Sequence, residues 1–424
     1  MTMSRGARVL AALALLGGLS ACELDFTDPN QPPEEEVIVT PATLARVAVG
    51  LQAQYSDQLA DPVYVTGLVT NEIGATPTAF ESYRRADAGS PITGDDGPSL
   101  DPWSGQYDVI RTANVLIENV PQVGFGPGTT SGLLALAKLY KAMAFGNLYQ
   151  HYESFPLVVQ STTSDAPFAT RAEAMTEILR LLEEARQHLA TTPPSPEFNT
   201  TVLAPGFNLA ATIDAMLARY NLIGGNLDAA MAAAQRVPLT SLSEFRFATG
   251  DVNPLWNLWY NSGNAYQMRA KQSFRLQAEA GDQRVAYWVS PDTIPGATQR
   301  MDQIARYNTN TRTYVVYFPD EMRLIMAEVH ARQNRLSEAL ALVNAVRTPC
   351  TSTLAEPVAC LPALTLAQVP TQQAMLDEIL RQRRYELYLQ GLRWSDLRRF
   401  GQPVKYEFMP VPTIECDRNQ SAPC

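Results

Sequence analysis

The densest group of side chains that could do chemistry lies near the C-terminal end of the chain. Its members alternate in charge and are Arg383, Arg384, Glu386, Arg393 and Asp396. A carboxylate held beside guanidinium groups can serve as a general acid or base. Their spacing is that of a helix and the turn after it, where opposite charges three residues apart form ion pairs. We therefore interpret the group as structural, with Trp394 able to stack on the guanidinium of Arg393.

The sequence lacks the common catalytic signatures. It contains no H-E-x-x-H metalloprotease motif, G-x-S-x-G elbow, Walker loop or dinucleotide fingerprint. Asp95, Asp96 and Asp101 could offer oxygen ligands to calcium, although a solvated loop is the simpler interpretation. A pair of carboxylates of the glycosidase type stays open, because any two acids can meet in a fold. We predict no catalytic residue, no metal site and no cofactor.

The first cysteine has the context of a lipid-attachment site. Residues 1–8 are basic, residues 9–16 are apolar, and residues 19–22 are Leu-Ser-Ala-Cys. This order is typical of a secretory signal with a lipobox, after which Cys22 is diacylated and becomes the first mature residue. The apolar run is much shorter than the roughly 18 residues that a membrane-spanning helix needs. An ordinary cleaved signal with a chance cysteine is the alternative.

The other four cysteines form two local pairs near the C-terminus, Cys350 with Cys360 and Cys416 with Cys424. In an exported protein an even number of thiols usually forms disulfides. Four cysteines allow three pairings, and we predict the two local ones. A zinc site is the alternative, but the sequence lacks close cysteine spacing and neighbouring histidines.

The charge of the chain excludes some classes of partner. The net charge is −10, and removal of residues 1–21 takes away two arginines and no acid, which brings it to −12. A protein this acidic lacks the clustered basic residues that binding to nucleic acid requires. The full sequence has 46% hydrophobic residues, and we expect the mature chain to fold around a large core.

Helical periodicity dominates the mature chain. One apolar stripe consists of Leu133, Ala137, Tyr140, Ala144 and Leu148. Further helices are expected at about 103–120 and 171–189, whereas residues 71–102 are rich in Gly, Pro, Asp and Ser and indicate loops.

Two later segments, 216–230 and 325–339, resemble each other. In both, a small residue on a first helix (Ala218, Ala327) is followed at the same distance by an alanine on a second helix (Ala230, Ala339). Small residues at these positions let two antiparallel helices approach closely, as in tetratricopeptide repeats. A chance pair of helical hairpins is the alternative.

These patterns predict an all-α fold, a tetratricopeptide-like helical solenoid with an irregular, loop-rich insertion. The expected divisions are a signal peptide at 1–21, an acidic tether at 22–39 and a single domain at 40–424. Within that domain we expect helical repeats at about 40–236 and 319–400, a variable insertion at about 237–318 and a disulfide-bearing tail at 401–424.

Several motifs, in order along the chain, resemble those of the SusD/RagB family. Residues 22–30 are similar to its C-x-L-D-x-x-D-P-N start. The most specific match, residues 383–401, is close to its R-R-x-E-L-x-x-E-G-x-R-W-x-D-L-x-R-x-G segment, although Gln390 replaces the usual acid. Other points of resemblance are at residues 107–114, 137–158 and 409–419. Together they span nearly the whole mature chain.

The resemblance implies a lipoprotein of the outer membrane, facing the cell surface and anchored through Cys22. Such a protein captures an oligomeric nutrient, above all a glycan, and delivers it to a SusC-like TonB-dependent transporter without altering it. Alternatives are a peptide ligand, a tetratricopeptide-type scaffold for another protein, or a surface glycosidase or protease.

In the family the ligand surface lies largely in loops outside the repeats. Sugar rings stack on aromatic side chains, and aromatic residues cluster at 253–261 and, more faintly, at 80–84. We expect some of these aromatic side chains to pack inside the insertion. The candidate ligand-binding residues are Trp256, Trp259, Tyr260, Tyr266, Trp288, Tyr83 and Arg84.

Lipidation can be tested with Cys22→Ser, which removes the thiol that would carry the acyl chains. We expect the variant to leave the membrane fraction and to lose labelling by a fatty-acid analogue, because buried acyl chains provide about 0.8 kcal/mol per CH₂ group. Membrane fractionation that is unchanged in the variant would contradict the assignment of Cys22.

Overall fold

Helices dominate the structure. The computed structural model describes residues 40–159, 165–261, 267–291, 301–354 and 356–424, and the part from Pro41 to Cys424 forms one compact unit. Each described strand is only two to four residues long. The predicted all-α class is therefore confirmed. Cys22, the tether and Tyr266 lie outside the described residues.

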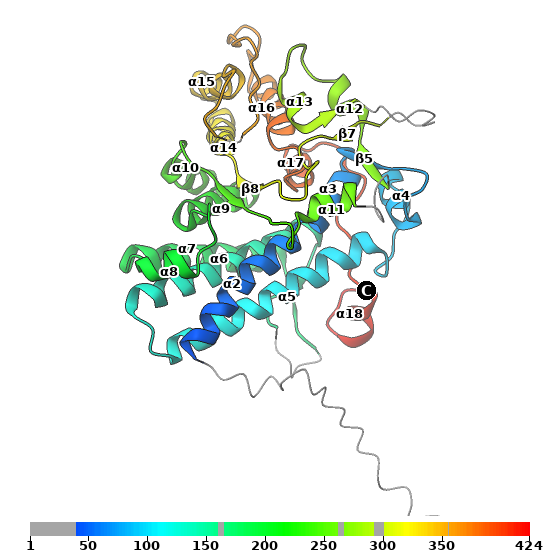
Figure 1. Cartoon of the computed structure of the whole chain (residues 1–424). Helices are drawn as coiled ribbons and strands as arrows, with labels where there is room; N and C mark the ends of the chain where they lie inside the picture. Colours follow the sequence, from blue (N-terminus) through cyan, green and yellow to red (C-terminus); the bar gives the residue numbers. More distant parts are fainter. Residues whose placement is uncertain (1–39, 160–164, 262–266, 292–300, 355) are drawn as a thin grey trace, which may run out of the picture. The chain divides into compact units, whose positions relative to one another are not determined.

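The helices and strands follow one another as shown in Figure 1. The helices of the first half are α2 (Pro41–Asp57), α3 (Ala60–Val69), α4 (Glu81–Ala88), α5 (Gly97–Asn119), α6 (Pro127–His151), α7 (Arg171–Thr191), α8 (Pro196–Thr201), α9 (Leu209–Ile223) and α10 (Leu227–Arg236). The later helices are α11 (Pro254–Tyr260), α12 (Gln272–Leu276), α13 (Arg284–Trp288), α14 (Pro319–Arg332), α15 (Leu336–Arg347), α16 (Gln372–Glu386), α17 (Arg393–Arg399) and α18 (Thr413–Arg418).

The strands form two-stranded antiparallel pairs. These are β1 (Ile73–Ala75) with β5 (Met268–Ala270), β2 (Phe155–Pro156) with β3 (Phe168–Ala169), β4 (Ser243–Phe245) with β8 (Tyr314–Tyr317), and β6 (Val289–Ser290) with β7 (Gln303–Ile304). The first pair connects the segment before α4 to the insertion, so residues far apart in the sequence lie side by side there.

Helix α6 is the central helix of the first half. All five residues of its predicted apolar stripe are fully buried, and α6 packs against both α5 and α7. Helix α7 begins with a capping box, in which the Thr170 hydroxyl accepts from the Glu173 backbone N–H and the Glu173 carboxylate accepts from that of Thr170. The helix predicted at 171–189 thus agrees with α7, and the predicted apolar stripe lies within α6.

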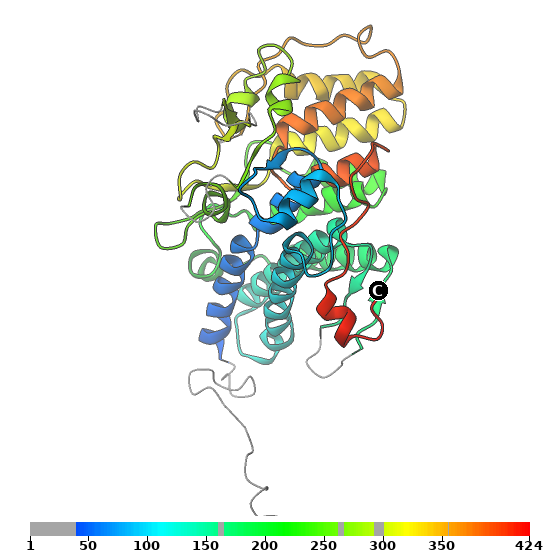
Figure 2. The same ribbon diagram turned by 90° about the vertical axis from the view of Figure 1, so that its right-hand side faces the viewer.

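The two similar segments form the helical hairpins α9/α10 and α14/α15. Ala218, Ala230, Ala327 and Ala339 are fully buried at these helix contacts. Helix α10 packs on α14, and α16 lies beside α14 and α15 (Figures 1 and 2). Arg219 of α9 makes a bidentate ion pair with Glu321 of α14, with both N···O distances at 2.7 Å. Small residues are thus buried within each hairpin, and a buried charge pair joins the two hairpins.

Residues 71–102 correct one expectation from the sequence. This region was predicted to be loops, but it contains β1 and α4, and α5 begins at Gly97 instead of near residue 103. Pro98 lies in the first turn of α5, where the missing N–H of proline costs nothing. Pro102 is accommodated inside the helix. Composition alone did not distinguish these prolines from loop residues.

The C-terminal cysteines are joined as predicted, Cys350 to Cys360 and Cys416 to Cys424. The first disulfide closes the loop after α15, and the second joins α18 to the last residue of the sequence. No described helix is long and apolar enough to cross a membrane.

The contact between α6 and α9 can be tested at Gly146. A Cβ at this position would overlap the phenol ring of Tyr220, so we expect Gly146→Ala to destabilise by about 1–3 kcal/mol through overpacking. This cost outweighs the roughly 1 kcal/mol that alanine gains over glycine in a helix. Gly50→Ala in α2 is the matched control, because a Cβ there meets nothing within 4 Å. Urea denaturation should show opposite signs for the two variants, and equal stabilisation of both would contradict the close contact.

Candidate functional site

Helix α3 supports both aromatic segments that the sequence nominated. Its residues from Pro62 to Val69 are all buried, and both α4 and α11 pack against it. Figure 1 shows α3, α4 and α11 next to one another. The segments at 80–84 and 253–261 are therefore brought to one region of the fold, although more than 150 residues separate them in the sequence.

The N-terminal end of α4 carries an exposed aromatic side chain. Phe80 is 62% exposed and contacts Tyr83 edge-on, at 5.7 Å between ring centroids. Tyr83 in turn packs on the buried ring of Tyr64 at 5.3 Å, so the exposed ring rests on a supported stack. Arg84 is exposed and donates to the Pro77 carbonyl at 2.8 Å. The sequence indicated Tyr83 and Arg84 but did not single out Phe80, because composition does not reveal which ring is exposed.

Helix α11 presents one tryptophan and buries another. Asn253 caps the helix by accepting from the backbone N–H groups of Leu255 and Trp256. The Trp256 side chain is partly exposed, and Tyr260, also partly exposed, donates its hydroxyl to the Ile304 carbonyl at 2.6 Å. We retain these two aromatic residues as candidates for ligand contact.

Two other predicted ligand residues lie in the core instead. Trp259 is 6% exposed and packs on Tyr307 at 5.9 Å. Trp288 is fully buried, and its indole N–H donates to the Tyr385 carbonyl at 2.8 Å. Neither ring has a face free for a ligand in this structure. Their role is to hold the insertion against the helices, as the sequence allowed for some of these aromatic side chains.

A pair of carboxylates, Asp61 and Asp101, lies beside this aromatic stack. Asp101 accepts from the Tyr64 hydroxyl at 2.7 Å. Burial, followed by the charge of Asp101, raises the pKa of Asp61 to about 7. A glycosidase also uses two carboxylates, placed on either side of the bond that it cleaves. Both side chains are partly buried, and neither lines either of the two large hollows of the described structure.

The calcium alternative finds little support in the same region. Asp96 accepts from Arg85 and from the Thr93 backbone N–H, and Asp101 is used by Tyr64. Among the residues that the structure describes, no group of three or more metal-ligating side chains converges.

The charged group at the C-terminus is an ion-pair network inside the fold. Asp396 accepts from Arg383 and Arg399, each at 2.8 Å, and Arg399 also binds Glu328 of α14 at 2.8 Å. Burial opposes ionisation, but these arginines hold the pKa values of Asp396 and Glu328 below their ordinary range. The network ties α14, α16 and α17 together, in agreement with the structural interpretation.

Two details of that group differ from expectation. The guanidinium over the Trp394 ring is that of Arg398, at 4.8 Å from the centroid, and not that of Arg393. Glu386 is approached by Arg284 of the insertion at 3.5 Å, and not by an arginine of its own helix. Arg398 lies one helical turn after Trp394 on α17, so i,i+4 spacing would have favoured it over the adjacent Arg393. Arg284 comes from another element, which spacing along one helix cannot reveal.

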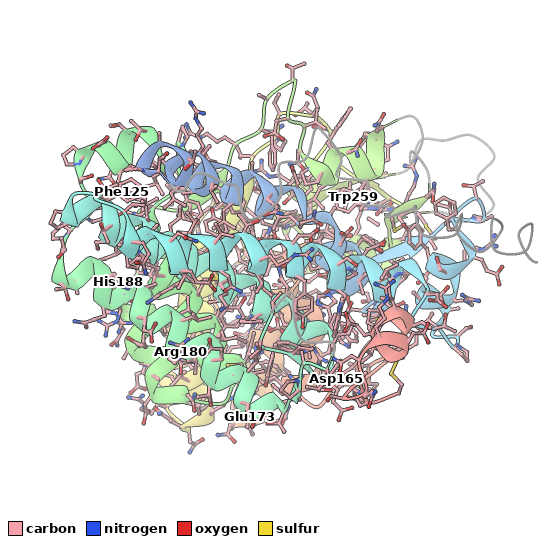
Figure 3. The ribbon with its side chains drawn as sticks, turned by 90° about the horizontal axis from the view of Figure 1, so that it is seen from below. Phe125, Asp165, Glu173, Arg180, His188 and Trp259 are labelled. Carbon is pink, nitrogen blue, oxygen red and sulfur yellow. A yellow bond between two sulfur atoms is a disulfide. The ribbon has the colours of Figure 1, made fainter. Side chains whose placement is uncertain are left out.

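Two large hollows are lined by residues outside α4 and α11. One, of about 650 Å³, is lined by Phe125 and by residues of α6 and α7, among them His188 of α7. The other, of about 830 Å³, lies along the C-terminal segment beside Phe408 and Arg171. None of the predicted ligand residues lines either hollow. Figure 3 shows Phe125 and His188 well separated from Trp259 of α11.

Comparison with known proteins identifies the fold. Residues 254–421 match the model of the SusD family. A SusD superfamily protein from Bacteroides fragilis superposes with a TM-score of 0.71 at 15% identity, over 92% of this chain and 100% of that one. A SusD-like carbohydrate binding protein from Bacteroides vulgatus gives a TM-score of 0.68 at 18% identity, over 86% and 84% of the two chains. A SusD superfamily protein from Bacteroides thetaiotaomicron gives 0.69 at 16% identity, over 90% and 97%. No curated protein matches the sequence.

The described part of the chain is thus a helical-repeat protein with a short-stranded insertion and an aromatic surface on α4 and α11. Its resemblance to the SusD/RagB family, expected from the sequence motifs, is confirmed by the family model and by the shared fold.

The buried carboxylate of Glu386 provides a test by pH. Burial, followed by the nearby carboxylate of Asp320, raises the pKa of Glu386 well above its ordinary value, and Arg284 offsets this only in part. The folded chain then holds a proton that the unfolded chain releases above about pH 4.3, so stability falls as the pH rises through the range between the two pKa values. Glu386→Gln should remove this loss, and its stability relative to the wild type should rise by up to about 1.4 kcal/mol per pH unit.

The matched control is Glu338→Gln, which changes an exposed glutamate of α15. Chemical denaturation at pH 5 and pH 8 compares the two variants. If Glu386→Gln changes the free energy of unfolding by the same amount at both pH values, Glu386 is ionised in the folded protein at both.

Proposed function

We propose that the mature protein is a lipid-anchored, surface-facing outer-membrane protein that captures an oligomeric nutrient, above all a glycan. In this proposal it delivers the nutrient to a SusC-like TonB-dependent transporter and does not alter it. The observation that carries the proposal is the exposed ring of Phe80, supported by Tyr83 and Tyr64, on a SusD-like fold. The lipobox at Cys22 supports the anchoring, and the carbohydrate-binding relative from Bacteroides vulgatus supports the ligand class.

The chemistry of the surface suits a ligand that is held by several weak contacts. An exposed aromatic ring offers one apolar face to a sugar, while Arg84 and the other polar groups nearby can bind hydroxyl groups. Stacking on one ring contributes about 1–2 kcal/mol, by analogy with the stacking of nucleic-acid bases. We therefore expect a dissociation constant in the micromolar range or weaker, that is, a binding free energy of about −8 kcal/mol or one less favourable. Such an affinity suits a protein that must release its cargo.

A scaffold for another protein is the second candidate. It is favoured by the burial of Trp259 and Trp288, because an insertion packed around its own aromatic side chains leaves less surface for a small ligand. The two candidates differ in what the loss of the Phe80 ring should do. Ligand capture on α4 requires this ring, whereas a scaffold for another protein does not.

The ligand surface can be tested by screening the mature chain against a glycan array and measuring the best binder by calorimetry. Phe80→Ala and Trp256→Ala should each weaken binding about five- to thirtyfold, because each removes a stacking face. Phe125→Ala is the matched control, since it removes a partly exposed aromatic side chain far from α4 and α11.

Three outcomes would count against the proposal. The first is an array without any bound glycan, which would favour the peptide or scaffold alternatives. The second is equal weakening by all three variants, which would separate binding from the aromatic surface. The third is cleavage of the bound oligosaccharide, which would make the protein an enzyme.

A further inference from the structure

Asp87, near the C-terminal end of α4, joins three segments that are distant in the sequence. Its carboxylate accepts from the Ala75 backbone N–H at 3.0 Å, at the end of β1. It also binds the Lys271 ammonium at 2.7 Å, directly after β5, and that of Lys405 at 3.2 Å, in the C-terminal segment. The Asp87 side chain is only 12% exposed, so these bonds are largely shielded from water.

Both lysine side chains lie close to neighbouring backbone. The Lys271 side chain crosses β1 at Gly74, where a Cβ would lie 2.6 Å from its Cε atom. Any residue other than glycine at position 74 would therefore displace it. Lys405 also donates to the carbonyl of Leu68, near the end of α3, at 2.6 Å. One carboxylate is thus shared by two positioned cations, and its removal leaves them facing each other without compensation.

The rest of α4 depends on such tertiary contacts. The helix has only eight residues, which is too short to be stable alone. Its C-terminal end is also held by Tyr406, whose hydroxyl lies 2.5 Å from the Ser90 carbonyl and 3.1 Å from that of Arg85. Its N-terminal end carries the exposed Phe80 instead. The contacts at the C-terminal end therefore add to the packing of Tyr83 on Tyr64 in positioning the aromatic end.

We propose that Asp87 is a positioning residue, which uses Lys271 and Lys405 to fix α4, and with it Phe80 and Tyr83, against β1 and the C-terminal segment. The contribution to ligand capture rests on the function proposed above, whereas the positioning of α4 does not. Asp87 touches no ligand in this account and acts only through the helix that carries the aromatic rings.

Hydrogen–deuterium exchange of the mature protein without ligand tests the positioning directly. In Asp87→Asn the amides of residues 80–90 should exchange on the order of tenfold faster, because a charge-assisted contact that closes the segment is lost. Exchange in α6 and α14 should stay within twofold of the wild type. Asp95→Asn is the matched control, an exposed aspartate in the following loop, and should change nothing. Asp87→Glu keeps the charge and should restore part of the protection.

The outcomes separate positioning from general stability and from the proposed function. Unchanged exchange of residues 80–90 in Asp87→Asn overturns the proposal, and so does faster exchange of equal size in α6 and α14. The same variants on the glycan array should show Asp87→Asn binding several-fold more weakly than Asp95→Asn. If the wild type binds no glycan, the proposed function fails, but the exchange result still decides whether Asp87 positions α4.

Discussion

The two buried carboxylates Glu328 and Asp396 are the constraint on which the C-terminal half of the structure depends. They neutralise Arg383 and Arg399, and both acids are at most 2% exposed. Removal of one partner from such a network typically costs about 3–5 kcal/mol, because the remaining charge stays buried without compensation. The chain can satisfy these charges only when α14, α16 and α17 meet in one arrangement. The repeat-like hairpin of α14 and α15 is thereby joined to the segment that follows it.

This network also reaches the candidate ligand surface through α3. The turn between α16 and α17 is buried, and Leu389 and Gly391 adopt positive φ angles there, of 57° and 69°. Tyr388 in this turn donates its hydroxyl to the Glu72 carbonyl at 2.9 Å, just after α3, and α17 packs on α3 itself. Since α3 carries α4 and α11, the most family-specific motif of the sequence lies directly behind the surface that we propose for binding. In the function that we propose, this motif acts by supporting that surface through α3.

The sequence correctly predicted the features that depend on local patterns along the chain. It did not predict the features that depend on the exposure of a side chain or on a partner distant in the sequence. The apolar stripe of α6, the paired alanines of the two hairpins and the local disulfides follow from spacing along the chain, and the structure contains all of them. Helix α4 was missed because its eight residues lie in a segment rich in glycine, proline and aspartate. Trp288 was nominated as a ligand residue and is a core residue, because an aromatic side chain in an irregular segment has the same composition whether it packs inward or outward. Phe80 is the converse case, an exposed ring whose support by Tyr83 and Tyr64 depends on α3.

A crystal structure of the mature protein with a bound oligosaccharide would test the central claim most directly. The account predicts that a sugar ring stacks on Phe80 and that the remaining contacts come from α4, α11 and the segments beside them. Sugar density in the hollow between α6 and α7 or along the C-terminal segment, with the ring of Phe80 free, would contradict it.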